Sequence, residues 1–411
     1  MARLADRQLK VLFHDYGGHA HTVRLARAMS AIGYAVSYVS FAGFSTPKGK
    51  VRAEGNDPTL FKATELNIAQ PFDKDDLIKR MRQQNEYAKV LERFAASEAP
   101  DIVISSNSPL EVQEILLRFC RRTKAGFVFW CQDIHSEAIS RILGKKNWLL
   151  GKGAGLFYRD KERRLLKQSN ALVVIAEAFV DVLNAPPWSL GRTDIHVVEN
   201  IAPLDEVPKF PRDNDWAVAH MRPGRKRIVY TGTLARKHNP ELLLELARHV
   251  DADVHLFSQG SAPDYVRETG AAEGLDNLFV WPWASVEDLP KVLGSADILY
   301  AVIEPDAGVF SVPSKVLSYL AAGRTVLGSI PLDNLAAQTV LRADAGRMVA
   351  PEDVSGLIAT ARVLLLDDQV RERIGANGRA YAERTFDVDG VAARFATIIE
   401  GISPTAKVAA Q

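Results

Sequence analysis

The stretch Gly308–Gly323, GVFSVPSKVLSYLAAG, has the pattern of a phosphate-binding loop that leads into a helix. It follows the run ADILYAVI at 296–303, which is short, apolar and rich in β-branched and aromatic residues. Such a run predicts a buried parallel strand. The order of strand, loop and helix is typical of a parallel α/β sheet, in which ligands collect at the carboxyl ends of the strands.

The residues at the start of this helix suit an anion. Pro313 fits the first helical position, and the small Ser311 and Ser314 allow backbone N–H groups to reach an anionic ligand. Lys315 adds a cation in the first turn, where the helix dipole disfavours one, so a bound diphosphate would explain its presence. A capped core helix without a ligand remains the alternative, because the helix also carries an apolar stripe.

Composition and length exclude several classes of protein. The 411 residues predict two domains, and 47% hydrophobic with 25% charged residues is the composition of a soluble globular chain. A formal net charge of +1 gives no overall field that would recruit nucleic acid. Cys120 and Cys131 lie in or beside apolar runs, which predicts reduced, buried thiols. We find no secretory signal and no apolar stretch long enough to span a bilayer, so we expect a cytoplasmic protein.

The first half opens with an apolar run at 10–13, a glycine turn at Gly17 and Gly18, and a helical pattern that ends near Gly33. This order is the start of a doubly wound α/β sheet, and the paired glycines would let the backbone approach a ligand. A tight turn without a ligand explains them nearly as well. Further along, His135 follows the run FVFW in a cluster of polar residues at a strand end, so it is a candidate site residue or a surface histidine.

Residues 145–167, KKNWLLGKGAGLFYRDKERRLLK, interleave aromatic and aliphatic residues with Lys and Arg. A basic amphipathic stretch of this kind can lie on an anionic membrane surface. A solvated helix face with a buried stripe is the alternative.

The strand-and-turn order restarts after a segment at 203–225 that has the composition of an interdomain linker. The strand at 227–230 leads to Gly232 and Thr233, and the strand at 254–257 leads to Gln259 and Gly260. The run at 278–280 leads to WPW, which ends at Trp283, and 324–328 predicts a further strand. The second half is therefore predicted to be a second parallel α/β unit, with a site between the two halves.

The second half contains five motifs in a fixed order: YTGTLARKHNPELLL, the Gln259-Gly260 strand end, WPWASVEDLPKVLGSADI, VPSKVLSYLAAGRTVLGS and GANGRAYAERTF. In these motifs and their order it resembles the retaining GT-B glycosyltransferases of family 4. The first half is similar more loosely, through the glycine turn, Gln132-Asp133, VVIAEAF and VVENIAP. Within the family the chain is similar to a subgroup that makes bacterial exopolysaccharides, capsules and O-antigens.

The resemblance implies an α/β protein of GT-B fold, with two Rossmann-like domains facing each other across a cleft. The acceptor domain would be 1–200, the nucleotide-sugar-binding domain 205–385, and the C-terminal helix at 386–411 would pack back on the first. The donor would be a nucleotide diphosphate sugar, UDP-linked by the family's usage. Its base would lie near 281–283 and its ribose near the helix after Pro313-Ser314-Lys315. The acceptor would be a saccharide or a polyprenyl-linked saccharide, with inner-membrane contact through 145–167.

Two features depart from the family pattern. Most members carry two glutamates spaced E-x7-E, and here Phe310 and Ser318 stand in those places. Members with a PSK signature share this loss, so Pro313-Ser314-Lys315 is interpreted as an alternative diphosphate-binding motif. Glu304 does not fit the E-x7-E spacing and is not assigned to it. Thr233 also replaces the family's arginine after the strand-end glycine, whereas Lys237 matches its basic residue.

The implied chemistry is metal-independent transfer with retention and without a cofactor. Lys237 and Lys315 are the candidate catalytic cations, with His135 as a further candidate and backbone N–H groups near Gly17, Gly18, Gly232 and Ser314 assisting. The Asp213-Asn214-Asp215 and Asp251-Ala252-Asp253 triplets are interpreted as surface residues and not as a metal site. The rival functions are a GT-B phosphorylase or epimerase, and an inactive nucleotide-sugar-binding protein.

Overall fold

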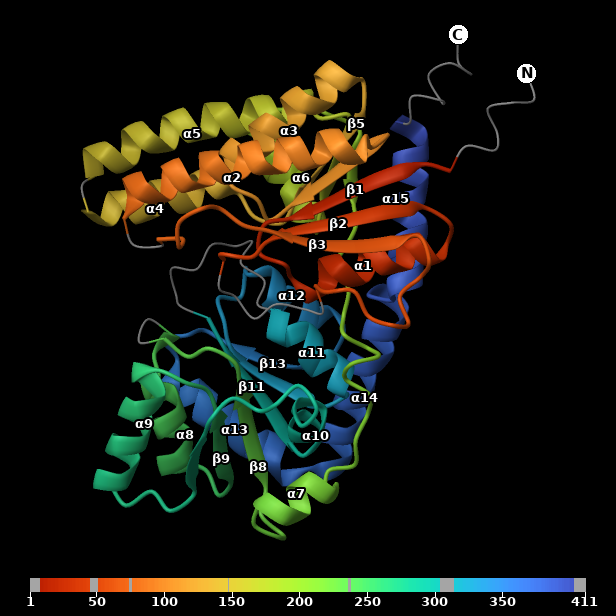
Figure 1. Ribbon diagram of the computed structural model, residues 1–411. Helices are drawn as coiled ribbons and strands as arrows, with labels where there is room; N and C mark the ends of the chain where they lie inside the picture. The colour runs from red at the N-terminus through yellow and green to blue at the C-terminus, as the bar shows by residue number, and fades with distance from the viewer. Residues whose placement is uncertain are drawn as a thin grey trace. The chain divides into compact units, whose positions relative to one another are not determined.

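The computed structural model describes residues 8–44, 51–73, 76–146, 148–235, 238–303 and 314–402. The chain divides into two compact units, one of Met1–Ile201 with Val388–Gln411 and one of Ala202–Asp387. Each unit is a parallel sheet with helices on both faces, as the ribbon shows (Figure 1).

In the first unit the described strands form a sheet in the order β3-β2-β1-β4-β5-β6-β7. β1 pairs in parallel with both β2 and β4, so the order reverses at this point. The carboxyl ends of the strands on either side of such a reversal are where doubly wound sheets bind ligands. The strands are β1 (Lys10–Asp15), β2 (Ala35–Phe41), β3 (Phe61–Leu66), β4 (Ile102–Ser106), β5 (Gly126–Cys131), β6 (Ala171–Val174) and β7 (Ile195–Val197).

Helices cover both faces of this sheet (Figure 1). α1 packs beside α15 on one face, where the Trp130 ring of β5 meets Phe395 of α15 at 4.9 Å between ring centres. α3 lies between α2 and α5 on the other face. The helices are α1 (Ala20–Ala31), α2 (Leu77–Glu98), α3 (Leu110–Thr123), α4 (His135–Lys146), α5 (Trp148–Gln168), α6 (Glu177–Asn184) and α15 (Val388–Ile402).

The second unit repeats the plan, and its described strands lie in the order β10-β9-β8-β11-β12-β13. Here the order reverses between β8 and β11, which pair in parallel. The strands are β8 (Arg227–Thr231), β9 (Asp253–Phe257), β10 (Leu278–Trp281), β11 (Ile298–Val302), β12 (Thr325–Ser329) and β13 (Gly346–Val349). The bounds of the first five agree with the strands predicted from the apolar runs of the second half, whereas β13 was not predicted.

Alternation along β11 explains why this sheet is covered on both faces. Ile298 and Tyr300 belong to the core beneath α8 and α13, whereas Leu299 and Ala301 belong to the core beneath α10 and α11. Successive side chains of a strand point to opposite faces, so a strand that is apolar throughout needs two helical layers. The helices are α7 (Asp215–His220), α8 (Glu241–His249), α9 (Ser261–Ala272), α10 (Leu289–Gly294), α11 (Ser314–Ala322), α12 (Leu335–Arg342), α13 (Val354–Leu366) and α14 (Asp368–Thr385).

The segment predicted as a linker is packed on the second unit. Arg212 Nε donates to Asp297 at 3.0 Å, and the buried Asn214 side chain accepts from Ala217 N to cap α7. Composition alone could not show this. A segment rich in Arg and Asp has the same composition whether its charged side chains are solvated or form ion pairs within the fold.

The basic amphipathic stretch forms most of a helical hairpin, in which α5 packs against α4. A Cβ on Gly151 would lie 2.4 Å from Gly144 Cα, and a Cβ on Gly155 would lie 2.5 Å from Ser140 Oγ, so the glycines permit close packing. The large apolar side chains at the start of α5 face outward, with exposed fractions of 67% for Trp148 and 61% for Phe157.

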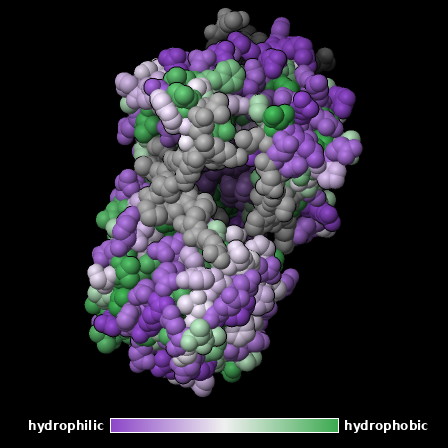
Figure 2. Space-filling view, turned by 90° about the vertical axis from the view of Figure 1, so that its left-hand side faces the viewer, coloured by the Kyte–Doolittle hydropathy of each residue, from purple (hydrophilic) through white to green (hydrophobic). Residues whose placement is uncertain are grey.

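Figure 2 views the molecule from the side toward which this hairpin projects in Figure 1, and hydrophobic side chains there lie among hydrophilic ones. None of the helices within the described residues is long and apolar enough to cross a membrane.

Candidate functional site

Lys315 lies against the turn that follows β8, at the point where the strand order of the second unit reverses. Its Nζ donates a hydrogen bond to the Tyr230 hydroxyl at 2.6 Å and lies 3.8 Å from the centre of the Tyr230 ring. A Cβ on Gly232 would come 3.6 Å from Lys315 Cε and Nζ. The structure therefore brings together two predicted site residues, Gly232 and Lys315, from separate segments of the chain.

Lys315 is a partly buried cation with no counter-charge among the residues that the structure describes. Burial lowers the pKa of Lys315 to about 7. Among the carboxylates that the structure describes, none forms an ion pair with its Nζ. An anion beside Nζ would favour the charged form and raise the pKa again. The site thus offers a small anion a protonated amine that gains a partner on binding.

Tyr319 anchors α11, the helix that carries Lys315, and the sequence reasoning missed it. Its buried hydroxyl accepts a hydrogen bond from Thr231 N at 3.1 Å and donates one to the Tyr300 carbonyl at 3.2 Å. These bonds tie α11 to the ends of β8 and β11, one helical turn from Lys315. The available signal was a tyrosine within the apolar stripe of a helix, since a buried phenol needs a polar partner.

The backbone N–H of Gly232 is already used within the fold. It donates to the Phe257 carbonyl at 3.0 Å, and the φ of +111° requires a glycine. Gly232 therefore gives Lys315 space and does not offer its N–H to a ligand in this structure. Thr233 is exposed, and its carbonyl accepts from the Tyr230 hydroxyl at 2.9 Å.

The other predicted residues of the second unit are less closely linked. Gln259, Gly260 and Trp283 are exposed, and Gly260 has a φ of +110° before α9. Ser314 begins α11. Lys237, Ser311 and Pro313 lie outside the residues that the structure describes.

The predicted glycine turn of the first unit encloses a carboxylate of its own. Asp15, at the end of β1, accepts hydrogen bonds from Gly17 N at 3.1 Å and from His19 N at 2.6 Å. Gly18 N donates to the Asp15 carbonyl at 3.3 Å. The N–H groups expected to meet a ligand are therefore satisfied inside the turn, because a buried strand-end carboxylate takes them first.

His19 fills the space that Gly17 leaves open. A Cβ on Gly17 would lie 2.2 Å from His19 Cε1. His19 Nδ1 lies 3.0 Å from Asp15 Oδ1, and the Thr22 hydroxyl also donates to Asp15. Burial raises the pKa of Asp15, but the hydrogen bonds and charge of His19 and the hydrogen bond of Thr22 outweigh it and lower that pKa to about 2.

His135 lines a cavity of about 310 Å³ in the first unit, near the carboxyl ends of β1 and β4. Its backbone N–H donates to Glu162 Oε1 at 3.0 Å, and Ser136 N donates to the other oxygen at 2.9 Å, so a buried carboxylate fixes the start of α4. Apolar side chains dominate the rest of the wall, together with Arg80, Gln84 and Asn107. The size and lining of the cavity suit an apolar group that also makes polar contacts.

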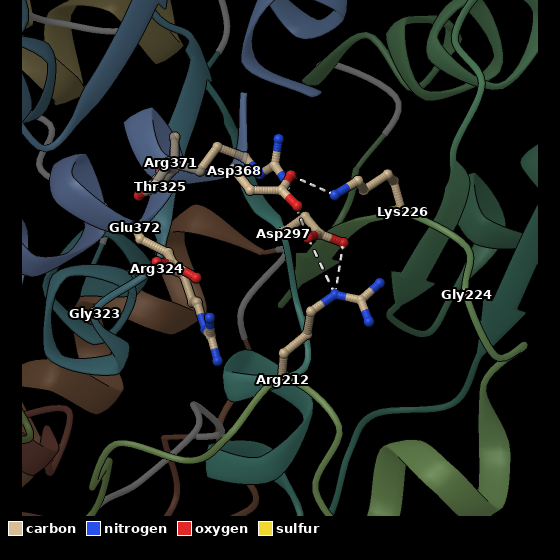
Figure 3. Close-up of a pocket in the computed structure, with 10 residues that line it drawn as sticks. All are labelled: Arg212, Gly224, Lys226, Asp297, Gly323, Arg324, Thr325, Asp368, Arg371 and Glu372. Carbon is tan, nitrogen blue, oxygen red and sulfur yellow. Dashed lines mark hydrogen bonds and ion pairs between the residues drawn. The ribbon is translucent and has the colours of Figure 1, made fainter. Parts of the chain in front are cut away.

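A further cavity, of about 240 Å³, lies at the amino ends of β8, β11 and β12, away from Gly232 and Lys315. Figure 3 shows Lys226 reaching Asp368, at 2.5 Å, and Arg212 reaching Asp297. Arg324 runs apart from these pairs and donates to the Phe210 carbonyl at 3.0 Å. The paired charges hold α14 and the 203–225 segment to the sheet, so we interpret this cavity as structural.

Comparison with known proteins covers the second unit most closely. Residues 225–368 match the family model described as glycosyl transferases group 1. A protein described as a colanic acid biosynthesis glycosyl transferase, WcaI, from Escherichia coli strain K12 is 27% identical over a match of 206 residues that covers 48% of this chain. The match spans 50% of the length of that relative.

Solved structures resemble the whole chain in fold. A sucrose-phosphate synthase from Thermosynechococcus elongatus has a TM-score of 0.74 at 13% identity, covering 96% of this chain and 99% of its own. HepE of Anabaena, solved in complex with UDP-glucose, has a TM-score of 0.66 at 14% identity, covering 96% of this chain and 100% of its own. The two parallel sheets, their strand orders and these neighbours confirm the predicted fold class. The chain has the two-domain GT-B fold, and residues 225–368 of its second unit are similar to the glycosyl transferases group 1 family.

Proposed function

We propose that the protein is a glycosyltransferase that moves a sugar from a nucleotide diphosphate sugar to a saccharide or polyprenyl-linked saccharide in bacterial cell-surface polysaccharide synthesis. The observation that carries the proposal is the Lys315 amine, which lies against Gly232 at the strand-order reversal and has no described carboxylate beside it. A nucleotide diphosphate supplies the missing negative charge. The group 1 domain match over the same residues supports this choice.

The chemistry follows from where charge develops. When the bond between the anomeric carbon and the donor phosphate breaks, negative charge grows on the diphosphate, and a preorganised cation in a water-poor site stabilises it. We assign this role to Lys315 and, as a second cation, to Lys237. His135 is the candidate contributed by the first unit, which would take the acceptor.

The donor is proposed to be UDP-linked. HepE, a neighbour in fold, was solved with UDP-glucose, and family usage points the same way. We place the base near Trp281–Trp283 and the ribose near α11. Retention and independence of a metal are part of the proposal. The anomeric configuration of the product and activity in the presence of a chelator test them.

The acceptor side involves the α4–α5 hairpin. Exposed Trp148, Leu149, Leu156 and Phe157 beside basic residues form a surface that suits contact with an anionic membrane, where a polyprenyl-linked acceptor would reside.

A thermal-shift panel with UDP, GDP, ADP and their sugars tests the proposal. A ligand at about 100 times its Kd stabilises a protein by about 2.7 kcal/mol, so a UDP donor should raise the melting temperature clearly. Lys315→Met should reduce the shift, and Lys291→Met, a lysine of the same unit paired with Asp215 at 2.6 Å, should not. Stabilisation by GDP and not UDP would overturn the base, and no shift with any nucleotide would overturn the function.

A further inference from the structure

The turn after β1 builds a carboxylate–imidazole pair at the strand-order reversal of the first unit. Asp15 is fully buried, whereas the His19 side chain is 36% exposed. The carboxylate accepts from Gly17 N, His19 N, His19 Nδ1 and the Thr22 hydroxyl, so it is ionised and held in place. The pair therefore joins a fixed anion to an imidazole that solvent and ligands can reach.

The pairing decides which ring nitrogen carries the proton. An ionised carboxylate can only accept, so Nδ1 is the donor, and in the neutral ring Nε2 keeps its lone pair. His19 Nε2 forms no hydrogen bond to any residue that the structure describes. In neutral His19 the exposed Nε2 is thus the nitrogen that can accept a proton, and the bond to Asp15 fixes its orientation.

Neighbouring histidines show that this arrangement is specific to His19. His14 is buried, with Nδ1 3.1 Å from Ser105 Oγ and Nε2 3.1 Å from Tyr87 Oη, and burial lowers its pKa to about 4. Burial also lowers the pKa of His21 to about 4, and its Nε2 is shielded from solvent. Neither can exchange protons with a ligand near neutral pH.

We propose that His19 accepts the proton of the acceptor hydroxyl during sugar transfer, with Asp15 as its positioning residue. This inference rests on the proposed function. The hydroxyl proton moves to Nε2 as the oxygen forms a bond to the anomeric carbon on the face from which the diphosphate departs, so that the proposed retention is kept. The bond from that carbon to the donor phosphate oxygen breaks, its electron pair leaves with the nucleoside diphosphate, and Nε2 later returns the proton to water. The ligand of His19 is therefore an alcohol of the saccharide acceptor.

The groups that face His19 set its pH range. Asp15 approaches from β1, and the neutral His21 of α1, which the cationic Arg24 influences, lies 5.7 Å from His19 between ring centres. Tyr38 Oη on β2 lies 3.4 Å from Asp15 Oδ2. Burial lowers the pKa of His19, but the hydrogen bond and charge of Asp15 outweigh it and raise that pKa above its usual value. Because the neutral ring is the active form, kcat/KM should rise with pH through this raised pKa.

The test compares His19→Gln, Asp15→Asn and the control His196→Gln, which removes an imidazole from β7 of the same unit. The probes are UDP-glucose as donor, and water and octyl glucoside as acceptors. His19→Gln should lower kcat/KM by roughly a hundredfold or more. It should also abolish the acidic limb of the pH profile, which is the rise of kcat/KM with pH as His19 loses its proton. Asp15→Asn should move that limb to lower pH, because the carboxylate charge that raises the pKa of His19 is lost. The control should behave as the wild type.

Two measurements separate the possible failures. UDP affinity by calorimetry should be equal in all variants, because His19 acts on the acceptor. The His19 pKa, followed by NMR in the wild type, should lie above the usual histidine value and fall in Asp15→Asn, which needs no turnover. An intact acidic limb in His19→Gln, or a His19 pKa at or below the usual value, would overturn the role of His19 alone. A wild type that binds no nucleotide and transfers no sugar would overturn the proposed function with it.

Discussion

Lys315 has a cost to stability that the sequence does not reveal. Its pKa is about 7 in the fold, against 10.5 in an unperturbed lysine. The unfolded chain therefore binds more protons between these values, so this lysine makes the ligand-free protein more stable as pH rises through that window. The burial therefore predicts that Lys315→Met stabilises the ligand-free protein at neutral pH.

The same pKa predicts how donor binding depends on pH. The bound diphosphate raises the pKa of Lys315, so binding takes up a proton and affinity falls as pH rises above about 7. Calorimetry with UDP on either side of that pH should show the fall in the wild type and in Lys291→Met. Lys315→Met should bind more weakly, by about tenfold or more, and lose this pH dependence.

Turnover gives a second view of Lys315. Lys315→Ala should lower kcat by about a hundredfold, and Lys315→Arg should keep part of the activity, because a planar guanidinium preserves the charge but not the compact shape. Wild-type affinity and turnover in Lys315→Ala would contradict the anion-binding role and leave α11 as a structural helix.

Sequence patterns predicted Lys315 and Gly232 because each breaks a local rule: a cation in the first turn of a helix, and a glycine at a strand end. They did not predict Asp15 or Tyr319. The roles of those residues depend on hydrogen bonds to partners that only the folded chain brings near, such as Thr22 and Tyr300. The glycine turn was found, but its purpose, room for the His19 ring, needed coordinates.

At the scale of elements, the α4–α5 hairpin is expected to bind membranes. Wild-type protein should sediment with anionic liposomes at low salt and be released at high salt, since each surface Lys or Arg contributes roughly 1 kcal/mol and is screened. Leu156→Gln with Phe157→Gln should weaken binding, because two exposed apolar side chains are lost. Val218→Gln, an equally exposed apolar position on α7, should not.

Neutral liposomes complete this experiment. Equal recovery of the wild type with neutral and anionic liposomes, or unchanged binding in the double variant, would contradict membrane contact through the hairpin.

Elements with continuous apolar runs were predicted well, and those without were not. The buried strands β8, β9, β11 and β12 were found within a residue or two of their bounds. β3, FKATEL, lies at the sheet edge with only Phe61 buried, so it gave no apolar signal. The amphipathic pattern at 145–167 was found, but its pairing with α4 was not, because that pairing depends on the close approach that Gly151 and Gly155 allow.

At the scale of the whole molecule, the first unit contains α15, a helix that follows the second unit in sequence. Phe395 is fully buried against Trp130, and the Tyr34 hydroxyl donates to Glu400 at 2.5 Å. Phe395→Ala should therefore cost about 3–5 kcal/mol in the unfolding of the first unit. In calorimetry the transition that UDP shifts should belong to the second unit and stay unchanged. A loss confined to the UDP-sensitive transition would contradict this division of the chain.

The position of α15 at the end of the chain also determines the order in which the two units can complete folding during synthesis on the ribosome. Domains usually fold from the N-terminus as they are synthesised. Here the strands of the first sheet emerge early, but the helix that covers Trp130 emerges only after residue 387, when every element of the second unit has left the exit tunnel. The later unit can finish folding before the earlier one. Until then the nascent first sheet carries an uncovered aromatic face, which is the kind of surface that chaperones bind.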